Sequence, residues 1–175
     1  MAWWALGSLP LFQVSQQLIA LLRNLYAKSQ LAVKMGVTLG DWFSAELGSR
    51  QSDPISPLSF ITLLECMMES ADCNVLCKGV NTHEPVIRDL RFADDVDLLA
   101  EEETELQLLI DQVHASSEDC GLKINTSKSK VLVFKKRWRS FSDYYMGTSV
   151  LECVHEFVYL GNLTTRDNDC SAVQK

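Results

Sequence analysis

The sequence predicts an α+β fold in which helices pack on one face of an antiparallel sheet. Predicted helices and short strands are mixed along the chain, without the strict alternation of strand and helix that marks a parallel sheet. Apolar residues recur at helical spacing in some segments and alternate in others, as in amphipathic helices and half-buried strands. The 175 residues, 47% hydrophobic and 22% charged, suffice for one domain with a core.

The first half of the chain predicts a helix, a strand and a second helix. Leucines recur every three or four residues from Gln16 to Tyr26, which marks one face of a helix, and LAVKMGV alternates as a strand does. After the polar loop GSRQSDPISP, Ser56 is the predicted N-cap of the next helix and Pro57 its first-turn proline. That helix, LSFITLLECMMES, is apolar almost all round and should lie deep in the core.

The second half predicts short strands around 75–80 and 86–92, a helix, and two further strands. Thr104 and Gln107 have the spacing of a capping box at the start of the helix, and Gly121 ends it. The helix carries one apolar stripe, formed by Leu106, Leu109, Ile110, Val113 and Cys120. The two predicted strands are KVLVF and HEFVYLG. The linker between them, KKRWRSFSDYYMG, shows neither the spacing of a helix nor the alternation of a strand.

The formal net charge of −7 argues against a protein that grips nucleic acid through a broad basic field. Contact with nucleic acid, if made, must therefore be local. One group of cations could provide it: Lys123, Lys128, Lys130, Lys135, Lys136, Arg137 and Arg139. A solvated surface is the alternative interpretation of this group, and of the acidic run from Glu101 to Glu105.

The cysteines and the N-terminus exclude several other classes of protein. The six cysteines contain no C-x-x-C pair and the three histidines are far apart in sequence, so neither a zinc site nor a disulfide framework is predicted. The opening MAWWALGSLPLF lacks the positive charge of a signal peptide. We therefore expect an intracellular protein with no membrane contact.

The stretch RDLRFADDVDLLA places two adjacent carboxylates, Asp94 and Asp95, between two runs of strand-forming residues. A plain turn is one interpretation, because aspartate tolerates turn geometry. Against it, the flanks look buried, the tip lacks glycine, and Arg91 is the only basic neighbour. Adjacent carboxylates repel unless a cation lies between them, and Mg²⁺ is commonly held by one or two carboxylates. Two such ions serve phosphoryl transfer in polymerases and nucleases.

RFADDVDLLA resembles the catalytic hairpin of reverse transcriptases, with its aromatic-Ala-Asp-Asp motif, and its neighbours are similar in the same order to those of LINE-type, non-LTR retrotransposons. The neighbouring stretches are LIALLRNLYAKSQLAVKMG, GSRQSDPISPLSF, SSEDCGLKINTSKSKVLVF and FVYLG. The resemblance implies an incomplete right-hand polymerase, with a catalytic β-hairpin in an antiparallel palm sheet. It assigns 1–50 to the end of the fingers with palm helix and strands, 51–134 to the palm, and 135–175 to a linker and primer-grip strand of a partial reverse transcriptase domain.

The resemblance also implies a two-Mg²⁺ mechanism on a primed RNA or DNA template. Asp94 and Asp95 would hold the metal while a primer 3′-hydroxyl attacks the α-phosphate of a deoxynucleotide. Phe92 would lie near the primer terminus, although simple core packing would explain it equally well. Lys128 matches a lysine that contacts or protonates the leaving pyrophosphate, and a surface lysine is its alternative.

Two further groups of residues are assigned through the resemblance. Arg50, Gln51, Ser52, Asp53 and Pro54 would shape the loop that touches template and incoming nucleotide. Tyr159, Leu160 and Gly161 match the primer grip, where a tight turn presents backbone to primer phosphates. An ordinary helix entry and an ordinary strand end are the alternatives for these two groups.

The chain departs from the family at two points. Members carry another metal-binding aspartate upstream of the region matched by Leu18 to Tyr26, which leaves one metal site incomplete here and indicates a fragment of a longer polyprotein with segments missing on both sides. Ser52 stands where the family usually has glycine. Three hypotheses stay open: an RNA-directed DNA polymerase domain, a non-catalytic palm relic that binds nucleic acid or protein, and the product of a truncated gene with an exposed apolar edge. Full-length members act in the cytoplasm and the nucleus.

Overall fold

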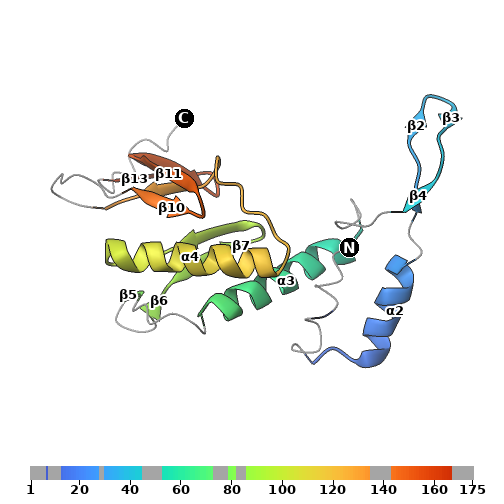
Figure 1. Ribbon diagram of the computed structural model, residues 1–175, viewed down its shortest axis with the longest axis horizontal. Helices are drawn as coiled ribbons and strands as arrows, with labels where there is room; N and C mark the ends of the chain where they lie inside the picture. Colours follow the sequence, from blue (N-terminus) through green and yellow to red (C-terminus); the bar gives the residue numbers. More distant parts are fainter. Residues whose placement is uncertain are drawn as a thin grey trace.

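The computed structural model describes residues 7, 13–27, 30–44, 53–72, 79–81, 86–134 and 143–166, and Figure 1 shows their arrangement. The helices are α2 (Gln16–Ala27), α3 (Ile55–Asp72) and α4 (Glu103–Asp119). The strands are β1 (Gln30–Leu31), β2 (Lys34–Met35), β3 (Thr38–Leu39), β4 (Phe43–Ser44), β5 (Val80–Asn81), β6 (Val86–Ile87), β7 (Asp89–Phe92), β8 (Asp95–Leu98), β9 (Lys130–Leu132), β10 (Tyr144–Met146), β11 (Ser149–Val154), β12 (Glu156–Tyr159) and β13 (Asn162–Thr165). This mixture of helices with small sheets confirms the predicted α+β class.

Helices α3 and α4 pack against each other, and strand β8 lies against them (Figure 1). Their shared core is formed by Leu64, Met67, Met68 and Ala71 of α3 with Val113 of α4. Val96 and Leu98 of β8 pack on this cluster. The hydrophobic effect therefore fixes the β7–β8 hairpin to the two helices through one of its faces.

A second cluster adjoins the first along the same apolar stripe of α4. Ile110 packs there with the strands of a three-stranded sheet whose order is β10-β11-β9, through Val131, Tyr144, Met146 and Leu151. β10 and β11 form an antiparallel hairpin, whereas β11 and β9 are parallel. Leu98 of β8 and Ile124 contact both clusters, so the hairpin, α3 and this sheet meet around one face of α4. The prediction of helices on one face of a single antiparallel sheet is replaced, in the described ranges, by several small sheets and one parallel pair.

Helix α3 begins one residue before the predicted N-cap. Asp53 caps it instead: its Oδ1 accepts a 3.0 Å hydrogen bond from the Ile55 amide, and its carbonyl accepts one of 3.0 Å from Ser56. The prediction of Ser56 as N-cap is wrong, because Asp53 already accepts from the first amides, through its carboxylate and its carbonyl. Ser56 is instead buried in the first turn. Pro57 does lie in the first turn, as predicted.

Helix α3 is buried along one side and exposed along the other. Leu58 and Ile61 keep 66% and 47% of their surface exposed, whereas Met67 and Met68 are buried. The expectation that this helix lies deep in the core holds for one side only, since no described element covers the Leu58 side. An apolar helix surface identifies a helix that can be buried, but the neighbours decide how much of it is.

Helix α4 confirms its predicted end and corrects its predicted start. Gly121 has φ +66°, and the amides of Gly121 and Leu122 donate to the carbonyls of Glu118 and Ser117, which is a complete Schellman motif. Residue Glu102 precedes the helix without a side-chain capping bond, so the capping box of Thr104 and Gln107 is wrong. The Gln107 amide is engaged elsewhere, with the backbone of β10.

Several strands differ from prediction. β10 lies in the segment that fitted neither period, and β11 follows it after a turn at Gly147. HEFVYLG forms β12 and a turn, but β13 follows, so it is not the last strand. LAVKMGV divides between β1 and the β2–β3 hairpin, which extends away from the helices with β4 (Figure 1). Most of the predicted strand around 75–80 lies outside the described residues. In the part of the chain that could be searched, no helix is long and apolar enough to cross a membrane.

Candidate active site

The aspartate pair lies at the tip of the β7–β8 hairpin, as the sequence predicts. Four antiparallel pairs form the ladder: Asp89 with Leu98, Leu90 with Asp97, Arg91 with Val96, and Phe92 with Asp95. Ala93 and Asp94 make a two-residue turn in which Ala93 has φ +54°. A hairpin turn of this length needs positive φ, which explains how the chain turns here without glycine.

The two faces of the hairpin carry different chemistry. Partners across a ladder share a face, so Phe92, Asp95, Leu90 and Asp97 lie together on one side. Phe92 is 61% exposed, and Asp94 and Asp95 are exposed as well. The expectation of buried flanks holds only for the other face, where Val96 and Leu98 pack on the helices. The carboxylates are therefore open to a ligand while the strands that bear them are anchored.

Asp97 adds a third carboxylate to the outer face. Burial raises the pKa of its carboxyl, and the negative charge of Asp95 raises it further. Asp97 is not among the site residues predicted from the sequence. Its signal was the two-residue spacing from Asp95, which places both side chains on one face of a strand.

The predicted primer-grip residues form a tight turn near these carboxylates. Leu160 and Gly161, with φ +48° and +82°, join β12 to β13, and Tyr159 pairs with Asn162 across the ladder. Burial raises the pKa of the Tyr159 hydroxyl, and the charges of Asp97 and then Asp95 raise it further. The fold therefore brings Tyr159 within electrostatic reach of the outer face of the hairpin, although more than sixty residues separate them in sequence.

The remaining predicted site residues are spread over other elements. Asp53 caps α3 and accepts a hydrogen bond from the Tyr26 hydroxyl of α2, and Pro54 is exposed beside it. Lys128 is exposed in the turn before β9, where its amide donates to the Asn125 carbonyl at 3.1 Å. Arg50, Gln51 and Ser52 lie outside the described residues, as do the four cations Lys135, Lys136, Arg137 and Arg139.

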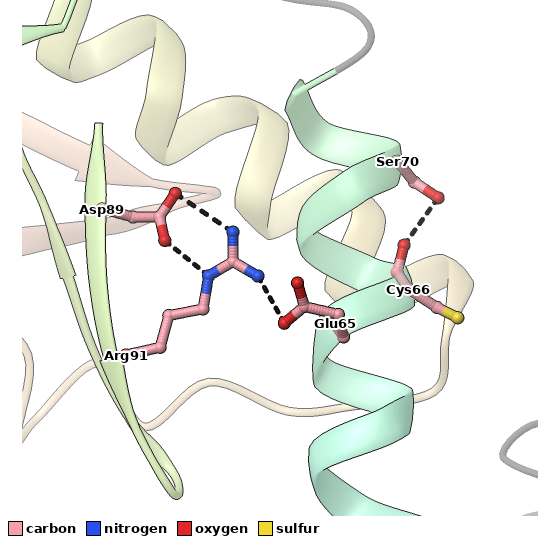
Figure 2. A network of polar contacts seen from close by, with 5 residues as sticks. All are labelled: Glu65, Cys66, Ser70, Asp89 and Arg91. Atoms are coloured by element: carbon pink, nitrogen blue, oxygen red, sulfur yellow. Dashed lines mark hydrogen bonds and ion pairs between the residues drawn. The ribbon is translucent and has the colours of Figure 1, made fainter. Parts of the chain in front are cut away.

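Arg91 does not neutralise the aspartate pair. Its guanidinium lies on the inner face, where Nη1 donates to Glu65 Oε2 of α3 at 2.7 Å, and Nε and Nη2 donate to the two carboxylate oxygens of Asp89 (Figure 2). The hydrogen bond to Asp89 is the main reason that the Arg91 pKa is raised, against the effect of burial. Arg91 is therefore not available to offset the negative charge of Asp94 and Asp95.

The oxygen ligands available here suit a hard cation such as Mg²⁺. Asp94 and Asp95 are exposed, and the pKa of Asp97 is raised first by burial and then by crowding of like charge beside Asp95. A bound cation would relieve that crowding. Among the residues described, no group of three or more histidine, cysteine or acidic side chains is placed to hold a metal ion.

Comparisons with known proteins agree on one family. The family model for "Reverse transcriptase (RNA-dependent DNA polymerase)" matches residues 4–162. The chain is 31% identical over 107 residues to the Pol polyprotein from type-1 retrotransposable element R2 of Nasonia vitripennis, a match that covers 61% of the chain and 10% of that protein. It is 27% identical over 136 residues to the Pol polyprotein from a type-2 retrotransposable element of Drosophila melanogaster, covering 70% of the chain and 13% of that protein. A putative uncharacterized transposon-derived protein of Caenorhabditis elegans is 33% identical over 87 residues, which is 47% of the chain and 30% of that protein.

The chain thus spans less than a third of each of these relatives. The range matched by the family model includes the β7–β8 hairpin, the start of α3 and the turn after Tyr159. It covers far more than half of the chain, and it confirms the resemblance to reverse transcriptases of LINE-type retrotransposons. The chain belongs to the reverse transcriptase (RNA-dependent DNA polymerase) family.

Proposed function

We propose that this chain carries out templated transfer of deoxynucleotides to a primer 3′-hydroxyl, as the catalytic part of an RNA-directed DNA polymerase. The observation that supports the proposal best is the pair Asp94 and Asp95, exposed at the tip of a hairpin whose inner face is anchored to α3 and α4. Exposed carboxylates on a fixed strand pair can bind a cation and a charged substrate without reorganising.

In this proposal Asp94 and Asp95 would hold Mg²⁺, and Asp97 would add negative charge from the same face as Asp95. When bound, Mg²⁺ supplies positive charge that favours the primer alkoxide and offsets charge on the phosphates. The primer 3′-hydroxyl would lose its proton to water as its oxygen forms a bond to the α-phosphorus, and the bond from the α-phosphorus to the pyrophosphate oxygen would break. Lys128 is the exposed side chain assigned to the leaving pyrophosphate.

The neighbours of the carboxylates take the roles of substrate contacts. Phe92, exposed beside Asp95, offers an aromatic surface for the sugar or base at the primer terminus. The Tyr159 hydroxyl, like that of any tyrosine at neutral pH, carries a proton and can donate a hydrogen bond to a primer phosphate. Asp53 and Pro54, with Arg50, Gln51 and Ser52, would form the template side of the site.

The test is primer extension on an RNA template with MgCl₂, by the chain as given and by a variant with Asp94→Asn and Asp95→Asn. We expect a loss of about 100-fold or more in the variant, because the ligands of the metal are removed. A matched control, Asp41→Asn with Glu69→Gln, also removes two exposed charges and should leave extension unchanged. Equal extension by the parent and the Asp94, Asp95 variant would refute the proposal. Salt-dependent binding of primer and template without extension by the parent would favour the non-catalytic alternative.

A further inference from the structure

We infer that Arg91 is a positioning residue that sets the orientation of the turn carrying Asp94 and Asp95, through its link to Glu65 of α3. The inference rests on the proposed function of that turn. The role inferred for Arg91 is not to neutralise Asp94 and Asp95, because its guanidinium is already paired with the carboxylates of Asp89 and Glu65.

The position of Arg91 in the ladder explains why its bond to Glu65 can affect the turn. Arg91 pairs with Val96, and this is the cross-strand pair of the inner face nearest to the turn, while Asp89 and Leu98 form the next pair inward. An isolated two-stranded hairpin is only marginally stable in water. The contact closest to its tip therefore decides how firmly the tip is held.

The two strands are held in different ways. β8 is held by apolar packing of Val96 and Leu98 on the helices. The alternate residues of β7, Leu90 and Phe92, are exposed on the other face, so the link from β7 to α3 is the hydrogen-bonded ion pair of Arg91 and Glu65 at 2.7 Å (Figure 2). Without it, β7 would follow β8 only through the ladder.

The geometry of the link is specific for arginine. The planar guanidinium uses Nε and Nη2 for the two oxygens of Asp89 on its own strand, which leaves Nη1 directed at Glu65 (Figure 2). The Asp89 side chain is 12% exposed and that of Arg91 23%, so water competes weakly for the bonds between them, whereas Glu65 is 43% exposed and its bond depends on the fixed direction of the guanidinium. Lysine would keep the charge but could not hold both carboxylates in one plane.

The first measurement is amide hydrogen exchange of the hairpin, residues 88–99, which needs no activity. Glu65→Ala removes the partner of Arg91 on α3 and leaves Arg91 paired with Asp89. Arg91→Lys keeps the charge but removes the planar guanidinium that binds both carboxylates. We expect hairpin amides to exchange about tenfold faster in each variant while amides of α4 are unchanged. Glu69→Ala, the same change one turn further along α3, is the control and should change neither. Unchanged hairpin exchange, or an equal increase in α4, would overturn the inference.

The second measurement is primer extension by the same variants. A positioning role predicts a fall in kcat of about 10- to 100-fold with an unchanged KM for the deoxynucleotide, since the reacting groups are misplaced but substrate contacts remain. The double variant should lose less than the product of the two single losses, because both act on one link. If the parent does not extend primers but its hairpin amides still exchange faster after Glu65→Ala, the proposed function is refuted. The role of Arg91 in holding the hairpin then stands. If the parent extends primers and the Glu65→Ala and Arg91→Lys variants extend them at the same rate, the positioning role of Arg91 is refuted.

Discussion

Replacing Asp97 with asparagine should stabilise the protein at neutral pH. Asp97 and Asp95 lie on one face of β8, two residues and therefore about 7 Å apart along the strand. Their repulsion is roughly 0.6 kcal/mol at the dielectric constant of water and about 2.4 kcal/mol at an effective value of 20. Since the pair lies at the surface and Asp97 is half-buried, we expect a gain of about 1 kcal/mol in the free energy of unfolding from Asp97→Asn.

The pH dependence distinguishes this cause from a change in packing. The pKa of Asp97 in the folded protein is raised above its ordinary value of 3.8, first by burial and then by Asp95. Below the unfolded pKa the carboxyl is protonated in both states, so it costs the fold nothing. The cost grows as pH rises from there and is complete above the folded pKa. The stability gain of the variant should therefore be full at pH 7 and absent at pH 3.

The assay is urea unfolding followed by circular dichroism at both pH values. A gain of about 1 kcal/mol corresponds to a rise of roughly 0.5 M in the urea midpoint at pH 7. Asp41→Asn, which removes an exposed carboxylate from the loop before β4, is the control for net charge and should shift the midpoint little. A gain that persists at pH 3, or no gain at pH 7, would show that Asp95 and Asp97 do not repel as their shared face requires.

Three further substitutions test contacts elsewhere in the fold, each by its urea midpoint. Gly121→Ala should destabilise by about 1 to 2 kcal/mol, because φ +66° strains a residue with a Cβ; an unchanged midpoint would contradict the Schellman geometry. Gln107→Ala should cost about 1 to 2 kcal/mol through loss of its two hydrogen bonds to the Tyr145 backbone, at 2.8 and 2.9 Å. Tyr26→Phe should cost about 1 kcal/mol by removing the hydroxyl that binds Asp53, and equal midpoints would show that α2 is held without this bond.

The parts of the fold that the sequence predicted correctly depend on local physics. Gly121 ends α4 because a residue with positive φ is needed there, and glycine adopts it without strain. The Asp94 and Asp95 turn was found because strand-forming runs flank it on both sides. In both cases the determining interactions lie within a few residues along the chain, so periodicity and residue type carry the signal.

The errors arose where a distant element competes for the same side chain. Gln107 has the spacing of a capping box, but the backbone of β10 offers it two hydrogen bonds and a capping bond offers one. Ser56 is a good N-cap by type, but Asp53 is fixed nearby by Tyr26 of α2. Tyr159 was assigned through its motif, whereas its electrostatic coupling to Asp97 depends on how β12 packs, which no local pattern encodes.

The division of charge between the two faces of the hairpin also bears on its register. A slip of one residue along either strand would exchange the faces of that strand. In β8 it would bury Asp95 and Asp97 among Met67 and Met68 and expose Val96 and Leu98, losing apolar burial and desolvating two carboxylates. In β7 it would direct Arg91 outward and leave Glu65 without its partner across the link. The same alternation that presents carboxylates to a ligand therefore opposes the slipped pairing, and the placement of Asp94 and Asp95 at the turn is a consequence of burial on the opposite face.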